Sequence, residues 1–152
     1  MKRILIILAA CVLSLSAMGQ NSLESIDDAR VFRVGADASA DFFLPNSNPS
    51  VGLGVRARFG RPDQWFNLIG ALRYIYGPRL SGFQIPLMLN MNLLRFDKLS
   101  AYVGAGYEFD FIGTYWGCTK FQTGILVGPH TDFRVFFKPY QGDLGVGFTY
   151  YF

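Results

Sequence analysis

Cysteine and histidine are scarce in this sequence, which contains two cysteines and one histidine among its 152 residues. We expect the first cysteine, Cys11, to be removed with an N-terminal targeting segment, so Cys118 has no partner for an internal disulfide. A disulfide-rich scaffold and a zinc site therefore both lack ligands. We expect neither a metal ion nor a cofactor in this protein.

Long apolar runs are also missing, although 51% of the residues are hydrophobic. The apolar stretch from Ile4 to Leu15 is shorter than the roughly 18 residues of a transmembrane helix. It follows Lys2 and Arg3, and this order of a basic and then an apolar region is typical of a signal peptide. Small residues at positions 17 and 19 predict cleavage before Gln20, so that residues 1–19 do not belong to the fold.

A lipoprotein signal is the alternative interpretation of the same segment. Residues 8–11 read Leu-Ala-Ala-Cys, a sequence in which Cys11 would be lipidated. The apolar run continues past this cysteine to Leu15, where lipoproteins usually become polar. Cleavage before Gln20 is therefore the preferred prediction.

Little net charge remains once the segment is removed. Loss of Lys2 and Arg3 takes the basic residues from 14 to 12 against 11 acidic residues, and the formal charge falls from +3 to +1. A balance this close to zero gives no indication of a nucleic-acid partner.

Alternation of apolar and polar residues is the main pattern that is present. Between Phe32 and Phe42 every even position is apolar, and every odd position is glycine, serine or charged. Seventeen glycines and 16% aromatic residues also favour short strands over helices. Eight segments show the alternation, with turn-forming residues between them: 32–42, 51–60, 66–76, 83–93, 101–111, 120–127, 132–138 and 143–152.

Eight such strands predict an all-β fold, an eight-stranded antiparallel up-and-down transmembrane β-barrel over residues 31–152. Residues 20–30 are expected to form a short periplasmic segment ahead of it. A lipocalin-like soluble barrel would show the same period with its apolar face inward. The outward direction is favoured because many aromatics stand near strand ends, as in the girdles of membrane barrels. The opposite face would then hold an interior charge network: Arg33, Asp37, Asp41, Arg56, Arg58, Arg73, Glu108, Asp110 and Lys120.

Over nearly all of residues 30–152 the chain resembles the small porin-like outer-membrane β-barrel family. The resemblance rests on the alternation, on residues 84–87 (Gln-Ile-Pro-Leu), on residues 101–106 (Ala-Tyr-Val-Gly-Ala-Gly) and on the aromatic ending from Gly147 to Phe152. It implies an outer-membrane location in a double-membraned bacterium, with outer-membrane lipid, lipopolysaccharide and the barrel assembly machinery as partners. It also implies that Phe148, Tyr150 and Phe152 form the C-terminal insertion signal. The compact segment from Gly128 to Asp143 departs from longer members, which puts loop-borne ligand binding in doubt.

Local irregularities have structural explanations. Pro86 lacks a ladder donor in the middle of a strand, so we expect a bulge or bend there. The paired glycines 52/54, 104/106 and 145/147 resemble phosphate loops, but they lie inside alternating strands. As inward residues they would make room for long arginine and tyrosine side chains.

No residue pattern indicates an enzyme. His130 is the only histidine, and Gly128-Pro129-His130 reads as a periplasmic turn rather than a catalytic base. Glu108 and Asp110 are a possible acid and base or a cation site, but pairing with Arg56, Arg58 and Arg73 is the preferred interpretation.

The loop after residue 111 contains further candidates. Tyr115 and Trp116 would anchor this loop at the membrane interface or contact a ligand. Cys118, at the end of the loop, is expected to be a free thiol that reagents reach from outside the cell.

Four functions remain open at this point. The leading hypothesis is a non-enzymatic outer-membrane barrel with a structural or interaction role and a plugged polar interior. The alternatives are a narrow pore for small solutes, a lipid-modifying enzyme, and a soluble periplasmic lipocalin-like binding barrel. A second histidine, which lipid cleavage would be expected to need, is lacking.

Overall fold

The computed structural model describes residues 30–43, 48–78, 81–96, 98–111 and 117–152. Several of the expectations lie outside these ranges. They concern the signal peptide, the cleavage site before Gln20, the lipidation of Cys11 and the loop residues Tyr115 and Trp116. Among the described residues, no helix is long and apolar enough to cross a membrane.

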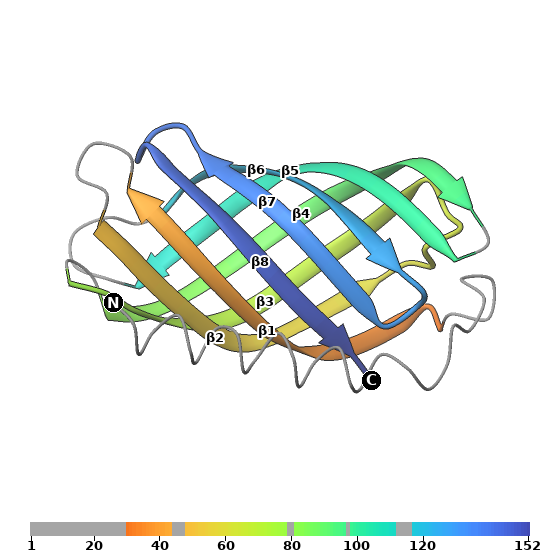
Figure 1. Cartoon of the computed structure of the whole chain (residues 1–152), viewed down its shortest axis with the longest axis horizontal. Helices are drawn as coiled ribbons and strands as arrows, with labels where there is room; N and C mark the ends of the chain where they lie inside the picture. The colour runs from red at the N-terminus through yellow and green to blue at the C-terminus, as the bar shows by residue number, and fades with distance from the viewer. Residues whose placement is uncertain (1–29, 44–47, 79–80, 97, 112–116) are drawn as a thin grey trace, which may run out of the picture.

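Eight antiparallel strands form one closed barrel, in which each strand pairs with its neighbours in sequence and β1 pairs with β8 (Figure 1). The strands are β1 (Phe32–Phe43), β2 (Asn48–Phe59), β3 (Phe66–Tyr76), β4 (Ser81–Phe96), β5 (Leu99–Phe111), β6 (Cys118–Val127), β7 (Thr131–Lys138) and β8 (Asp143–Tyr151). The predicted eight-stranded up-and-down barrel is therefore confirmed.

The two ends of the barrel are named by the strands that begin and end there. We call the end at which β1 begins and β8 finishes the terminal end, and the other end the distal end.

The register fixes the tilt of the strands. Following the pairs once around the barrel from Phe32 leads through Phe59, Leu68, Leu89, Ala105, Phe121, Phe137 and Leu144 to Phe42, ten residues farther along β1. Ten residues of rise over eight strand spacings correspond to a tilt of about 40°. At this strand number the interior is only wide enough to be filled by side chains.

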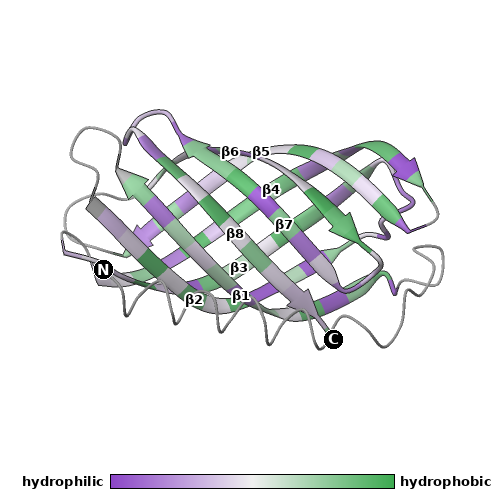
Figure 2. Ribbon diagram, viewed as in Figure 1, coloured by the Kyte–Doolittle hydropathy of each residue, from purple (hydrophilic) through white to green (hydrophobic). Residues whose placement is uncertain are grey.

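Side chains alternate between the two faces of the sheet as the sequence predicts. Figure 2 shows apolar and polar residues alternating along the strands, and the burial pattern follows this alternation. In β2, Leu53 is 68% exposed, whereas Arg56 and Arg58 are buried. The apolar face therefore points outward, and the charged face lines the interior.

Of the bulge or bend expected at Pro86, the bulge is not there. Pairing between β3 and β4 skips Ala71 and Leu72 next to Pro86, but the register is the same on both sides, so no residue is inserted. The sheet thus accommodates the missing proline N–H by a local gap in one ladder. A register shift occurs instead between Asn92 and Leu94 of β4.

Turn residues close the terminal end. Pro62, in the turn between β2 and β3, is fully buried, and Asn92 Nδ2 donates to its carbonyl at 3.0 Å. Pro129 is buried in the turn between β6 and β7, where Gly128 adopts a φ of 58° that favours glycine. Both turns lie over the barrel interior rather than away from it.

Among the paired glycines, Gly147 makes room for a long arginine side chain, as expected. The expectation is wrong for the other five, which first meet the side chains of Ile75, Asn90 and Phe136 or the backbone of a neighbouring strand (Gly52, Gly54, Gly104, Gly106 and Gly145). A Cβ atom at Gly147 would clash with the guanidinium of Arg134, and one at Gly124 would clash with the Tyr102 hydroxyl. At Gly145 the clash would be with the ring of Phe136. The glycines are needed because a barrel this narrow has no other space for these groups.

Candidate functional site in the barrel interior

The barrel interior gathers all nine residues of the predicted charge network. Arg33, Asp37, Asp41, Arg56, Arg58, Arg73, Glu108, Asp110 and Lys120 are all buried on the inner face. Three further buried charges, Asp132, Arg134 and Lys138 of β7, were not included in that prediction. Buried charges are stable only when they are paired and hydrogen-bonded, so their partners decide what the interior does.

Glu108 is the centre of the distal half of the network. Its carboxylate pairs with Arg73, with Lys120 Nζ at 2.7 Å and with Lys138 Nζ at 2.7 Å. Lys138 also lies 3.0 Å from Asp41. The fully buried Glu108 carboxylate thus joins β5 to β3, β6 and β7, and Lys138 extends the cluster to Asp41 of β1.

The expected pairing of Glu108 is thus correct for Arg73 and wrong for Arg56 and Arg58. The Arg58 guanidinium lies 4.9 Å from the centre of the Tyr151 ring and donates to the Pro129 carbonyl at 3.5 Å, near the terminal end. Arg56 lies 3.9 Å from Asp132 and donates to Gln122. Alternation specifies which face a residue occupies, but it does not give the height at which the residue sits along the barrel.

Arg134 pairs with Asp37 near the middle of the barrel. Arg134 Nη2 lies 2.5 Å from Asp37 Oδ1, and both side chains are fully buried. Thr149 donates to the same carboxylate oxygen at 2.6 Å and accepts from Arg134 Nη1 at 2.7 Å. This triad joins β7, β8 and β1 and stabilises the seam at which the barrel closes.

Phe136 is an apolar side chain inside the charged interior. Its ring lies 3.9 Å from Lys120 Nζ and 5.7 Å from the guanidinium carbon of Arg73, both within the range of cation–π attraction. Alternation did not single it out, because Val135, Phe136 and Phe137 form a continuous apolar run. With Gly145 beneath it, the ring occupies space that a water-filled channel would need.

The terminal half of the interior contains a small cavity of about 10 Å³. Arg58, Asp132 and Tyr151 contribute to its wall, together with three asparagine side chains. Tyr102 donates to Asp132 at 2.7 Å across this region. A cavity of this volume accommodates about one water molecule, so it is not a solute channel.

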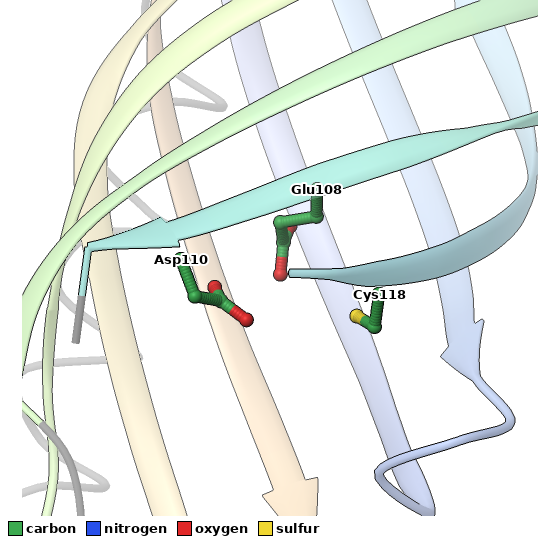
Figure 3. Close-up of side chains that lie close together, drawn as sticks. All are labelled: Glu108, Asp110 and Cys118. Carbon is green, nitrogen blue, oxygen red and sulfur yellow. The ribbon is translucent and has the colours of Figure 1, made fainter. Parts of the chain in front are cut away.

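Glu108, Asp110 and Cys118 lie close together at the distal end, and Figure 3 shows the three side chains. One potential ligand atom from each lies within 4.8 Å of the others. The donor set is one that a divalent cation accepts, but Glu108 is already neutralised by Arg73, Lys120 and Lys138. Two ammonium groups 2.7 Å from its oxygens would repel a further cation. The geometry favours the interpretation of Glu108 as an ion-pair partner.

Cys118 is not the exposed loop thiol that the sequence suggested. It is a free cysteine, as expected, but it is the first residue of β6 and is buried. Its position in the alternation places it on the inner face, opposite Glu108 in the β5 to β6 register. We therefore expect reagents outside the folded barrel not to reach it.

His130 is a turn residue, as predicted. Its Nδ1 lies 2.7 Å from the Tyr151 carbonyl oxygen and 3.0 Å from Arg33 Nη1. Its ring stacks on Tyr150 at a centroid distance of 5.7 Å. These contacts fasten the turn between β6 and β7 to β8 and β1.

The residues of the expected insertion signal follow the outer face of β8. Phe148 packs against Phe133 of β7, with 5.0 Å between ring centroids, and Tyr150 contacts Phe152 at 5.9 Å. Phe152 directly follows the strand and is exposed. Their role in insertion stays a prediction.

No protein-family model and no curated protein matches this chain. Among solved structures, a chain described as "De novo design of transmembrane beta-barrels" is similar, with a TM-score of 0.52 and 14% sequence identity. The match covers 79% of this chain and 95% of the designed chain. At this identity the similarity concerns the fold alone, and the fold is that of a transmembrane β-barrel.

Proposed function

We propose that this chain is an integral outer-membrane β-barrel of the small porin-like family, exported through a cleaved signal peptide. Its role is structural or interaction-bearing, and its polar interior is plugged. The observation that carries the proposal is the inversion of the usual burial pattern. Large apolar side chains are exposed on all eight strands, while charged side chains are buried inside.

This inversion argues against a soluble barrel. A soluble lipocalin-like protein would turn its apolar face inward, whereas here Leu53, Leu89 and Phe133 are each more than half exposed. Exposed apolar area on this scale is stable in hydrocarbon and drives association in water. A closed barrel is also one of the two backbone arrangements that satisfy every hydrogen-bonding group in a bilayer.

The filled interior supports the plugged form over a pore. The Glu108 cluster, the Arg134 to Asp37 pair and the Phe136 ring occupy successive parts of the lumen. The partners of this barrel are outer-membrane lipid, lipopolysaccharide and the assembly machinery that inserts it. We propose no catalytic activity, because the charged groups are held in pairs and His130 is engaged in a turn.

Fractionation of cells that express the full-length chain tests this proposal. We expect the protein in the outer-membrane fraction, and a gel mobility that differs between unboiled and boiled samples because a closed barrel resists detergent until heated. A soluble periplasmic protein without a heat-dependent shift contradicts the proposal. In planar bilayers we expect no stepwise conductance from the purified barrel, and stable single-channel steps would establish the narrow-pore alternative instead.

A further inference from the structure

The hairpin of β4 and β5 extends beyond the neighbouring strand β3 at the terminal end. Phe66, the first residue of β3, pairs with Met91, whereas β4 continues to Phe96. In this extension the apolar side chains of Leu94 and Phe96 flank Arg95 in the sequence, and all three residues are exposed. A charged side chain that stands between apolar groups at the edge of a bilayer extends to the polar boundary, where its charge stays solvated.

The guanidinium group of Arg95 is held in one orientation. Its carbon lies 4.3 Å from the centre of the Trp65 ring, and Nη1 donates to the Asp63 carbonyl at 2.6 Å. The turn that carries these two residues is itself fastened to β4, because Asn92 N donates to the Trp65 carbonyl at 2.9 Å and Asn92 Nδ2 donates to the Gln64 carbonyl at 2.5 Å. One face and one nitrogen of the guanidinium are therefore occupied.

The edge formed by Nε and Nη2 of Arg95 is open. Among the described residues, Nη1 is the one nitrogen of this group with a hydrogen-bond partner. The carboxylate of Asp63 is 3.1 Å from Arg61 Nε and forms its ion pair there. The N–H groups of Nε and Nη2 are parallel, and such a pair binds two oxygens of one phosphate or carboxylate group. The open edge is thus oriented to accept a bidentate anion.

We propose that Arg95 binds the phosphodiester of an anionic glycerophospholipid at the terminal end of the barrel, with Trp65 covering one face of the guanidinium. The site rests on the proposed function, in which the exposed apolar side chains of β4 meet hydrocarbon. Phosphodiester groups lie where the hydrocarbon ends, and an indole ring is typical of the same boundary. A zwitterionic headgroup carries a cation of its own that competes for the phosphate, so the anionic headgroup is preferred. The terminal end follows the expected periplasmic segment 20–30 and would face the periplasmic leaflet, which favours a glycerophospholipid over lipopolysaccharide.

Native mass spectrometry of the barrel, released from detergent micelles, tests the site. The micelles contain equal amounts of phosphatidylglycerol and phosphatidylcholine with the same acyl chains. We expect one phosphatidylglycerol to remain bound, with an affinity about tenfold above that of phosphatidylcholine, since a charged bidentate contact is gained. Inorganic phosphate should not displace it, because the acyl chains also bind the apolar face. Equal retention of the two lipids, or displacement by inorganic phosphate, overturns the proposal.

Arg95 and Lys98 provide matched variants in one hairpin. Arg95→Lys keeps the charge but lacks the two parallel N–H groups, and we expect it to lose most of the preference for phosphatidylglycerol. Lys98→Gln removes a charge from an exposed side chain near the same turn, and we expect most of the preference to remain. If Arg95→Lys keeps the full preference, or if Lys98→Gln loses as much as Arg95→Lys, diffuse surface charge attracts the lipid and the proposal is wrong.

The gel mobility of unboiled and boiled samples separates this inference from the proposed function. Each variant is compared with the original chain after its heat-dependent shift shows a closed barrel. A soluble chain without the shift contradicts both the proposed function and the lipid site. A closed barrel from the outer-membrane fraction without a preference for phosphatidylglycerol overturns the lipid site alone.

Discussion

Arg134 of β7 and Asp37 of β1 form an ion pair across the inside of the barrel, with 2.5 Å between Nη2 and Oδ1, although β8 lies between their strands. The pair therefore connects elements that share no backbone hydrogen bonds. It stabilises the closure of the sheet, where the first and last strands must find each other.

A double-mutant cycle on this pair measures the connection. Asp37→Asn and Arg134→Gln are each expected to cost about 3–5 kcal/mol in unfolding free energy, because each leaves a buried charge without its partner. The double variant should cost less than the sum, by about 0.5–3 kcal/mol. Urea unfolding in micelles provides the measurement.

Arg61 and Asp63 serve as the control pair for this cycle. They lie 3.1 Å apart in the turn after β2, and each side chain is about one third exposed. Solvent screens this pair, so we expect a coupling below about 1 kcal/mol. Equal coupling in the two pairs would contradict a stabilising role for the interior pair.

Glu108 and Asp110 are predicted to differ in their importance, although they are two residues apart on the same inner face. Glu108→Gln leaves Arg73, Lys120 and Lys138 without their shared carboxylate and should cost about 3–5 kcal/mol. Asp110 accepts a hydrogen bond from Gln141, which an asparagine can also make, so Asp110→Asn should cost about 1 kcal/mol or less. If both substitutions lower the free energy of unfolding by similar amounts, Glu108 is not the centre of the network.

Cys118 is expected to be protected from polar thiol reagents. In a chain that begins at Gln20 it is the only cysteine. A charged maleimide should leave the folded barrel unlabelled and react fully after unfolding, because the side chain is buried on the inner face. Tyr140→Cys, in an exposed turn at the same end, provides the reactive control. Rapid labelling of Cys118 in the folded barrel would place the thiol outside.

The alternating sequence predicted the strands, their number and their inner faces because a period of two is set by the backbone itself. The alternation of apolar and polar residues was less regular over β6 and β7 than elsewhere. In β7 the aromatic Phe136 occupies an inward position among the charged residues. The three charges of this strand, Asp132, Arg134 and Lys138, were therefore not assigned to the network.

The partners inside the barrel were harder to predict than the faces. Glu108 pairs with side chains from β3, β6 and β7, and only the register and the tilt of the strands determine which of them reach it. The register shift between Asn92 and Leu94 was not predicted either, because no glycine or proline marks this place in the sequence.

Leu53 and Tyr76 test whether the outer face meets hydrocarbon. Both lie on the apolar outer face with nearly equal exposure, 68% and 70%, but Leu53 is in the middle of β2 and Tyr76 is at the distal end of β3. In a bilayer, Leu53→Arg should cost about 2–4 kcal/mol and Tyr76→Arg about 0–1 kcal/mol, because a charge is most costly at the midplane. In water, the two arginine substitutions would change the free energy of unfolding by equal and small amounts, because the two positions are equally exposed. Unfolding of both variants from lipid vesicles compares the two cases, and equal costs would contradict a membrane-spanning barrel.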